Sequence, residues 1–452
     1  MELAGRRVAV VGLGVSGFSA ARRLIELGAL VFATDANTSP AIEERAATLR
    51  AAGARVETGA HELDDLDAEL AVVSPGIPPG APVVLTLRAA AITVIGEVEL
   101  ASRLARCDFL AVTGTNGKTT TTALLAAILA RSDVPSVAAG NIGLPLIDAI
   151  TTIPSHGAIA VEVSSFQLDT IERFAPHVAI VLNVAEDHID WHGTFEAYVD
   201  AKARIVANQG PNDVCVVNAC DHHALEIASR GASRIVPFSA ESAPGEGIGV
   251  RRGTVVWRGR TVFDAGLIPL PGVAGLEDAL AAAGAALEYG VDPRIVAQAV
   301  EGFRPLHHRL EPVGELNGVS FIDDSKATNP HATLSAVRGL ENVVLIAGGR
   351  AKGNDLAPLA STVPPVIAVV AIGESSDEIV KVFEGLVPVE KASSMKEAVA
   401  LARRHAAPGG SVLLSPGCAS LDMYDGYAAR GADFERAVRA LDDREGRQHR
   451  HA

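Results

Sequence analysis

Short apolar runs rich in valine and isoleucine alternate with alanine-rich helical stretches along the whole chain. Strands buried on both faces read as continuous apolar runs, and parallel strands need a crossover connection that is usually a helix. The alternation therefore predicts α/β domains with mostly parallel sheets. The strands we expect span residues 7–11, 30–34, 70–73, 109–113, 158–163, 178–183, 214–218, 319–322, 343–347, 366–372 and 411–415, and the clearest helices span 17–27, 119–130 and 278–289.

The length of 452 residues suggests about three domains of roughly 150 residues each. With 48% hydrophobic and 21% charged residues, each domain can bury a core. One boundary is expected near residues 93–97 and another near 302–305, after the long alanine-rich helix. We predict three α/β domains, at 1–95, 96–303 and 304–442.

The bulk composition excludes several classes of function. A net charge of −15 without a basic stretch disfavours nucleic-acid binding. Because no apolar run reaches the roughly 20 residues of a membrane span, we expect no membrane insertion. The four cysteines are scattered without metal-ligand spacing or a disulfide framework, so reduced thiols in a cytoplasmic protein are expected.

The most specific motif is a glycine-containing loop between an apolar strand and an Ala/Leu-rich helix. Such a loop lets backbone amides approach phosphates, and the helix N-terminus adds partial positive charge. Lys118 can bridge the β- and γ-phosphates, and the Thr119 hydroxyl can ligate Mg²⁺. The loop is shorter than the general nucleotide-hydrolase form, and a plain turn with a chance lysine is the alternative. Its residues are Gly114, Thr115, Asn116, Gly117, Lys118, Thr119 and Thr120.

A second glycine loop, Gly12-Leu13-Gly14-Val15-Ser16-Gly17, follows the first strand, and Asp35 closes the second strand. Alone, this pattern is the dinucleotide fingerprint and would suggest an NAD-dependent enzyme. It is weakly specific, because a glycine turn at this junction suits many nucleotides, including a uridine nucleotide. A purely structural tight turn is the third interpretation.

Two potential metal ligands follow strands of the central domain. Glu162 lies in Val161-Glu162-Val163-Ser164-Ser165-Phe166-Gln167, and His188 closes Glu186-Asp187-His188. The carboxyl ends of parallel strands face the ligand crevice, so both side chains can hold Mg²⁺ there. Each residue taken singly would more naturally be structural, and it is the co-occurrence with a phosphate loop that favours a metal site.

These central segments resemble those of the Mur ligases, and the resemblance covers essentially the whole chain. Three C-terminal segments are similar to the branch of that family that adds D-glutamate: 323–330 (DDSKATNP), 348–352 (GGRAK) and 414–422 (LSPGCASLD). The resemblance implies a Rossmann-like N-terminal domain, a central P-loop-type ATPase domain and a C-terminal Rossmann-like α/β domain. It also implies peptide-bond formation through an acyl phosphate. The implied substrates are ATP, UDP-N-acetylmuramoyl-L-alanine and D-glutamate, with two Mg²⁺ ions and a monomeric enzyme.

The resemblance also implies roles for individual residues. Thr119 and Glu162 would meet one Mg²⁺, His188 a second, and Lys202 would be carbamylated, with Lys118, His188 and Lys202 as the catalytic set. Sequence alone favours a plain surface lysine at position 202. Additional ATP contacts would come from Arg309, Asp324 and Lys326. The UDP-substrate would be held by Ser16, Asp35, Ser74, Gly76 and Asn141, and D-glutamate by Thr328, Lys352, Ser420 and Tyr427.

The chain departs from the family pattern at a few positions. Ala274-Gly275 and Asp278 stand where a His-Asn pair and a second Asn are usual, which puts amide contacts to adenine in doubt. Ala36 and Asn37 replace a common Arg, and Tyr427 replaces a commoner Phe. Three alternatives remain: another amide ligase such as a sister Mur enzyme or a folylpolyglutamate synthase, an NAD-dependent oxidoreductase, and a non-catalytic UDP-sugar-binding homologue.

Overall fold

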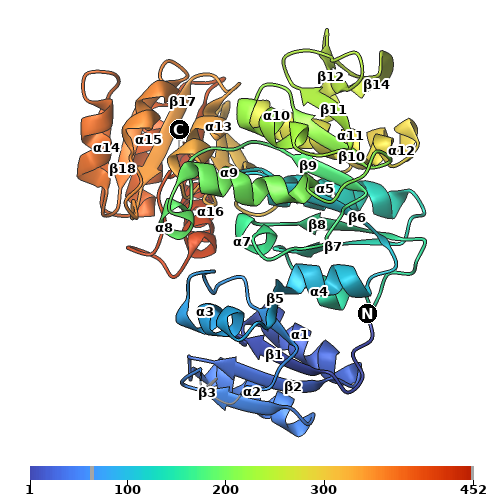
Figure 1. The fold of residues 1–452 in the computed structure, drawn as a ribbon. Coiled ribbons are helices and arrows are strands. Elements are labelled where there is room, and N and C mark those ends of the chain that lie inside the picture. Colours follow the sequence, from blue (N-terminus) through green and yellow to red (C-terminus); the bar gives the residue numbers. More distant parts are fainter. Residues whose placement is uncertain (62–65, 449–452) are drawn as a thin grey trace. The chain divides into compact units, whose positions relative to one another are not determined.

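The structure, a computed structural model, describes residues 1–61 and 66–448 of the chain. Its strands form three sheets of five, nine and six strands (Figure 1). The chain divides into two compact units. The first unit holds residues 1–251, 255–262 and 280–299, and the second holds 252–254, 263–279 and the chain from residue 300 onward.

The first sheet is parallel, with the strand order β3-β2-β1-β4-β5. Val8 and Val10 of β1 share a core with α1 and α2, whereas Ala9 and Val11 share one with α3. Neighbouring residues of a strand point to opposite faces, so helices cover both sides of the sheet. The elements are β1 (Arg7–Val11), α1 (Val15–Glu26), β2 (Leu30–Asp35), α2 (Pro40–Ala51), β3 (Arg55–Thr58), β4 (Leu70–Val73), α3 (Pro82–Ala89) and β5 (Thr93–Gly96).

The second sheet has the order β14-β13-β12-β11-β10-β9-β6-β8-β7, and β11, β10, β9, β6, β8 and β7 pair in parallel. Its strands are β6 (Asp108–Thr113), β7 (Ser136–Gly140), β8 (Ala158–Glu162), β9 (Val178–Val181), β10 (Val214–Asn218), β11 (Arg234–Ser239), β12 (Ile248–Arg251), β13 (Thr254–Trp257) and β14 (Arg260–Asp264). The helices of this region are α4 (Glu97–Leu104), α5 (Lys118–Arg131), α6 (Leu146–Ala149), α7 (Ser165–Leu168), α8 (Ile189–His192), α9 (Phe195–Ala203), α10 (His222–Ser229), α11 (Gly272–Glu288) and α12 (Pro293–Glu301).

The third sheet belongs to the second unit and has the order β15-β16-β20-β17-β18-β19. Only the edge strand β15 runs antiparallel among its described pairings. Val344 and Ile346 pack with α15 and α16, and Val343 and Leu345 pack with α13 and α14. The elements are β15 (Glu311–Leu316), β16 (Val319–Asp323), α13 (Pro330–Val337), β17 (Val343–Gly348), β18 (Val366–Ile372), α14 (Ser376–Phe383), β19 (Val389–Ala392), α15 (Met395–His405), β20 (Ser411–Leu414) and α16 (Tyr427–Gln448).

The predicted strands are all present, and each ends within two residues of its expected limits. Nine strands, however, escaped prediction: all six edge strands, β3, β5, β7, β14, β15 and β19, and the internal strands β11, β12 and β13 of the second sheet. Edge strands face water along one side, so sequences such as Arg-Val-Glu-Thr in β3 or Val-Glu-Lys-Ala in β19 lack a continuous apolar run. The predicted start of the long helix at residue 278 is wrong, because α11 begins at Gly272.

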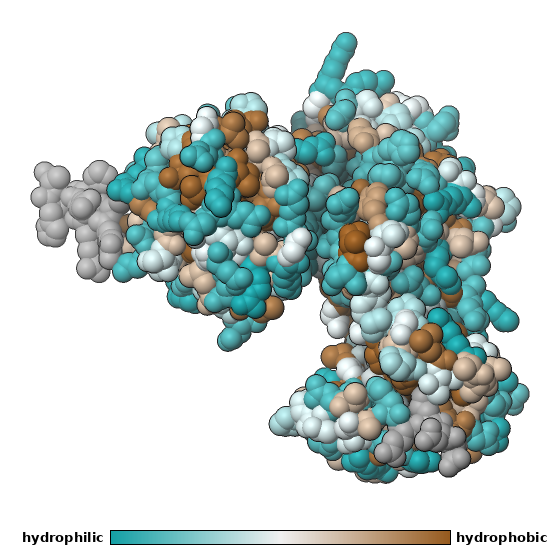
Figure 2. All heavy atoms as spheres, turned by 60° about the vertical axis from the view of Figure 1, so that its left-hand side comes forward, coloured by the Kyte–Doolittle hydropathy of each residue, from teal (hydrophilic) through white to brown (hydrophobic). Residues whose placement is uncertain are grey.

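Hydrophilic residues dominate the face shown in Figure 2, and hydrophobic residues form separate patches on it. Within the part of the chain that the structure describes, no helix combines the length and the apolar character that a membrane span requires.

Candidate active site

The predicted phosphate loop joins the end of β6 to the start of α5. Gly114 has φ +154°, and Gly117, with φ +84°, caps the N-terminus of α5. The backbone amide of Thr115 donates to the Asn183 carbonyl at 2.8 Å, which ties the loop to the end of the neighbouring strand β9. The Nζ of Lys118 donates to the carbonyls of Gly114 and Thr115, at 2.9 Å each. A cation and a helix N-terminus thus lie together, and this arrangement suits a phosphate group.

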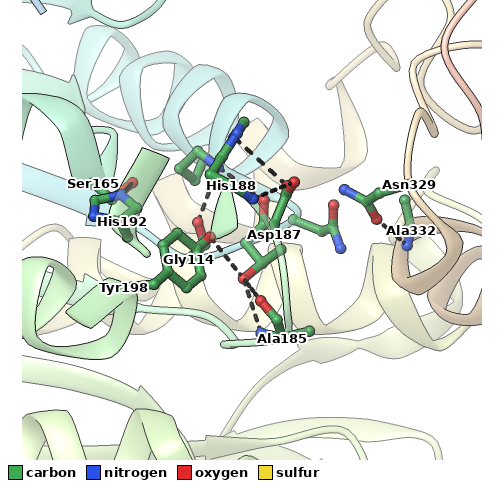
Figure 3. A network of polar contacts seen from close by, with 12 residues as sticks. Gly114, Ser165, Ala185, Asp187, His188, His192, Tyr198, Asn329 and Ala332 are labelled. Carbon is green, nitrogen blue, oxygen red and sulfur yellow. Dashed lines mark hydrogen bonds and ion pairs between the residues drawn. The ribbon is translucent and has the colours of Figure 1, made fainter. Parts of the chain in front are cut away.

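Thr115 connects this loop to two other segments. Its Oγ1 accepts from the backbone amide of Ala185 at 2.9 Å and lies 3.1 Å from the hydroxyl of Tyr198 (Figure 3). Tyr198 is buried in α9, four residues before Lys202, so both side chains share one face of that helix. Sequence reasoning missed Tyr198, although its four-residue spacing from Lys202 was a usable signal.

Lys202 is not the surface lysine that its sequence context favours, because its side chain is only 1% exposed. Its Nζ donates to the Gly114 carbonyl at 2.7 Å and lies 4.4 Å from the centre of the Tyr198 ring. Burial lowers the pKa of Lys202 well below its usual range, and the nearby charge of Lys118 lowers it further, whereas Asp187 opposes the shift. The side chain is therefore a buried amine directly beneath the phosphate loop.

Glu162 ends β8 and is 3% exposed. Its Oε1 accepts from Asn141 Nδ2 at 2.7 Å, and the Asn141 amide donates to the Glu162 carbonyl at 2.8 Å. Its Oε2 is buried and has no hydrogen-bond partner among the described residues. A buried carboxylate oxygen without a donor is costly unless a cation or ligand satisfies it.

His188 lies at the N-terminus of α8 in the left-handed conformation, with φ +56°. Its ring stands edge-on to Phe166 with 4.8 Å between ring centres, and its Nε2 lies 3.7 Å from Asp187 Oδ2 (Figure 3). Burial lowers the pKa of His188; Asp187 opposes that shift, and Lys118 and Lys202 reinforce it. A neutral imidazole is the form that binds metal ions.

The glycine loop of the first sheet is braced by two of the predicted UDP-substrate residues. Asp35 accepts the Leu13 amide at 2.6 Å, and the Ser74 hydroxyl donates to the Gly12 carbonyl at 2.9 Å. A Cβ on Gly17 would lie 1.9 Å from that same carbonyl, so only glycine fits there. Asp35 and Ser74 thus support the loop itself, with Ser16 half-buried within it and Gly76 exposed after β4.

In the second unit, Asp324 follows β16 and is largely buried. Its carboxylate accepts from the Ser415 hydroxyl at 2.9 Å and from the Leu310 amide, next to Arg309, at 3.2 Å. Burial raises the pKa of Asp324 to about 7. Lys326 Nζ lies 4.3 Å from the centre of the Tyr427 ring, so two predicted residues from distant parts of the chain meet here.

The remaining candidates for D-glutamate binding lie on three loops of this unit. Thr328 precedes α13 and is half-buried, Lys352 is exposed after β17 with φ +55°, and Ser420 is buried after β20. The Gly417 amide donates to the Ala327 carbonyl at 3.0 Å, which joins the first and third of these loops.

Arg430 joins two loops of the second unit by hydrogen bonds, and sequence reasoning missed this role. Its side chain is 2% exposed and donates from Nε to Ser325 Oγ at 3.0 Å and from Nη2 to the Ser325 carbonyl at 2.8 Å. Its Nη1 donates to the Cys418 carbonyl at 3.1 Å. Burial lowers the pKa of Arg430 to about 10. In the sequence this residue looks like one of the solvated arginines of α16, and no local pattern distinguishes it.

The unusual segment 274–278 lies within the first turns of α11. A Cβ on Gly275 would lie 2.5 Å from the Cβ of Leu270 and 2.8 Å from its backbone carbon, so a larger residue does not fit without rearrangement. Glu277, next to these positions, pairs with Arg338 at 3.5 Å, and the Val273 amide donates to the Arg338 carbonyl at 2.9 Å. The departure at 275 is therefore matched to local packing.

These features define an α/β protein with a glycine-containing loop at a helix N-terminus, a buried lysine that donates to this loop, and a buried carboxylate at the end of the adjacent strand. Three family models match the chain in order: "Mur ligase MurD-like, N-terminal domain" over residues 6–96, "Mur ligase middle domain" over 112–286 and "Mur ligase, glutamate ligase domain" over 308–418. The chain belongs to the Mur ligase family, and the predicted three-domain α/β fold is confirmed. The boundaries at 95/96 and 303/304 stay predictions.

Curated relatives align along almost the whole chain. A UDP-N-acetylmuramoylalanine–D-glutamate ligase of Acidobacterium capsulatum is 41% identical, with 97% of each chain covered. The ligase of the same name from Frankia casuarinae is 44% identical, covering 97% of this chain and 94% of the relative. Among solved structures, Thermotoga maritima MurF ligase in complex with ADP aligns with a TM-score of 0.60 at 15% identity over 97% and 96% of the two chains. At such identity the likeness concerns the fold alone.

Proposed function

We propose that this protein is the ATP-dependent ligase that joins D-glutamate to UDP-N-acetylmuramoyl-L-alanine in peptidoglycan precursor synthesis. The observation that carries the proposal is the full-length alignment, at about 40% identity, with relatives that bear this enzyme's name. The phosphate loop, with Lys118 at the start of α5, supports the ATP-dependent step. The substrates are therefore ATP, the UDP-linked L-alanine carboxylate and D-glutamate.

The reaction needs an activated carboxylate, because a carboxylate is itself a poor electrophile. An oxygen of the L-alanyl carboxylate attacks the γ-phosphorus of ATP, and ADP leaves. The amine of D-glutamate then attacks the acyl carbon, phosphate leaves, and the amine loses a proton. Negative charge builds up in the phosphoryl transfer, so Lys118 and the N-terminal amides of α5 are placed to stabilise it. The loop residues 114–120 hold the triphosphate.

The residues beneath the loop fit Mg²⁺. Glu162 offers a buried oxygen without a donor among the described residues, Thr119 offers a hydroxyl, and His188 offers a neutral imidazole. Oxygen ligands and retained water are what Mg²⁺ prefers. Bound Mg²⁺ would neutralise charge on the phosphates. We propose that Thr119 and Glu162 meet one ion and His188 a second.

Lys202 fits a carbamate. A neutral amine can attack the carbon of CO₂, forming an N–C bond with loss of one proton. The lowered pKa of Lys202 supplies that neutral form. The resulting anion has oxygen donors, which an ammonium group lacks, and can therefore serve the metal ions beside Glu162 and His188.

The substrate-binding assignments remain proposals that rest on the family resemblance and on the groupings described above. Additional ATP contacts are assigned to Arg309, Asp324 and Lys326. The UDP-substrate is assigned to Ser16, Asp35, Ser74, Gly76 and Asn141, and D-glutamate to Thr328, Lys352, Ser420 and Tyr427. We propose a monomer, as the family resemblance implies. The cytoplasmic location stays a prediction from the four cysteines, which are free thiols in the structure.

The decisive experiment measures phosphate release from ATP with UDP-N-acetylmuramoyl-L-alanine and a panel of amino acids. D-Glutamate should give both phosphate release and the amide product, and L-glutamate is the matched control. Product with another amino acid, and none with D-glutamate, would identify a sister ligase instead. A nicotinamide-dependent absorbance change would favour the oxidoreductase alternative, and UDP-substrate binding without any turnover would favour a non-catalytic homologue.

A further inference from the structure

Two helices of a single turn each follow the proposed metal ligands. Glu162 ends β8, and α7 begins three residues later at Ser165, while His188 immediately precedes α8. A single helical turn is not stable by itself, because nucleation costs more than one turn of hydrogen bonds returns. Glu162 is held by the pairing of β8 with β6 and β7, whereas the position of His188 depends on what holds α8.

The helix α8 has few means of support within its own segment. It is bounded by two residues with positive φ, His188 at +56° and Gly193 at +80°. All four of its residues keep some solvent exposure, and no side-chain hydrogen bond caps it in the described part of the chain. Its position is consequently fixed by contacts with α7 and with the Tyr198 ring of α9, whose centre lies 5.4 Å from that of His192.

His192, the last residue of α8, makes most of these contacts. Its Nε2 lies 3.0 Å from the Ser165 hydroxyl, and its Nδ1 lies 3.6 Å from a carboxylate oxygen of Asp169 (Figure 3). Its ring stacks on Phe166 at 5.7 Å between ring centres with an interplanar angle of 9°. The side chain of His192 is 4% exposed, so these interactions are shielded from water.

The order serine, histidine, aspartate has the appearance of a nucleophilic triad, but burial excludes that chemistry. Ser165 is 2% exposed, so its hydroxyl is closed to a substrate. What the arrangement can do is join α7 to α8. The Phe166 ring also contacts the ring of His188, and its centre lies 4.5 Å from that of the Trp191 ring. Ring contacts therefore run without a break from His192 through Phe166 to His188, the candidate metal ligand.

We propose that His192 is a positioning residue that fixes the imidazole of His188 relative to the carboxylate of Glu162, through its contacts with Ser165 and Asp169. The inference rests on the proposed function, because it takes Glu162 and His188 to be metal ligands. Some residues orient a metal ligand without contacting the metal themselves. Their removal commonly weakens metal binding by about 10- to 100-fold.

The test uses the full-length protein with Mn²⁺ as the probe and a non-hydrolysable ATP analogue, and follows free Mn²⁺ by electron paramagnetic resonance. Loss of His192 in H192A should weaken Mn²⁺ binding by about 10-fold or more. S165A removes one contact at almost constant volume and should weaken it in the same direction. H192Q keeps a polar group near the position of Nε2 and should recover part of the loss. His156, exposed in the same domain, gives the matched control H156A.

Mn²⁺ affinity within twofold of the wild type in both H192A and S165A would overturn the proposal, even if melting temperatures fell. If H192A fails to fold, S165A alone decides between the two outcomes. The KM for D-glutamate, measured in parallel, should stay unchanged while kcat falls. Absence of D-glutamate turnover in the wild type would refute the proposed function but leave the Mn²⁺ measurement intact, so the two failures are distinguishable.

Discussion

Glu97, the first residue of α4, offers a sharp test of the packing between α4 and α6. It is 3% exposed, and its Oε1 accepts the Ile147 amide at 2.6 Å. Its Oε2 is buried without a hydrogen-bond partner among the described residues. Burial, with a smaller contribution from the charge of Asp148, raises the pKa of Glu97 to about 7 against the opposing hydrogen bond from the Ile147 amide. The carboxyl group is therefore neutral in the folded protein at mildly acid pH.

The size of the effect follows from the two pKa values. In the unfolded chain the carboxyl titrates near 4.5, and in the folded protein near 7. Between these values the unfolded state releases a proton that the folded state keeps, so stability falls as pH rises and levels off above the folded pKa. From pH 5 to pH 8 the loss is about 2–3 kcal/mol. Glu97→Gln keeps the shape of the neutral acid and should abolish that loss.

The assay is urea unfolding at pH 5 and pH 8, followed by the fluorescence of Trp191 and Trp257, which both belong to the first unit. Relative to the wild type, E97Q should gain about 2–3 kcal/mol between the two pH values. Glu44, exposed on α2, gives the control Glu44→Gln, for which no pH-dependent difference is expected. A constant difference between E97Q and the wild type at both pH values would refute the reasoning.

Three further predictions concern Lys118, Lys202 and Arg430. Lys118→Ala should lower kcat by about 100-fold or more with an unchanged melting temperature, because it removes a cation from the developing phosphate charge, and full retention of ligation would contradict the proposed site. Isotopically labelled bicarbonate should give a carbamate NMR signal in the wild type that Lys202→Ala lacks, and an active wild type without this signal would exclude the carbamate. Arg430→Met should destabilise the second unit by about 2–4 kcal/mol in denaturant unfolding, because it leaves buried acceptors unpaired, whereas the exposed Arg439→Met should have little effect.

The central strands and the phosphate loop were predictable because their causes are local. Strand β10 (Val214–Asn218) begins with four apolar residues and is buried at every position, so its sequence by itself predicts a buried strand. The glycines at 114 and 117 occupy backbone conformations that favour glycine, and the helix that follows is rich in alanine and leucine. The segments that resemble the Mur ligases then predicted the candidate binding residues of the second unit.

The start of α11 and the edge strands were not predictable in this way. Gly275 looks like a helix breaker, but it is required where α11 passes Leu270. The edge strand β3 contains two charged residues, Arg55 and Glu57, and its pairing with β2 is fixed by the rest of the sheet. In each case the local sequence is ambiguous, and contacts with distant residues decide the outcome.

The sequence by itself determined the alternation of buried strands and helices, the phosphate loop and the family, because periodicity and glycine geometry act over a few residues. Only the tertiary structure decided that Lys202 is a buried amine, that Arg430 joins two loops and that His192 connects α7 to α8. Whether a polar side chain is solvated or buried depends on segments far away in the chain, and no local pattern contains that information.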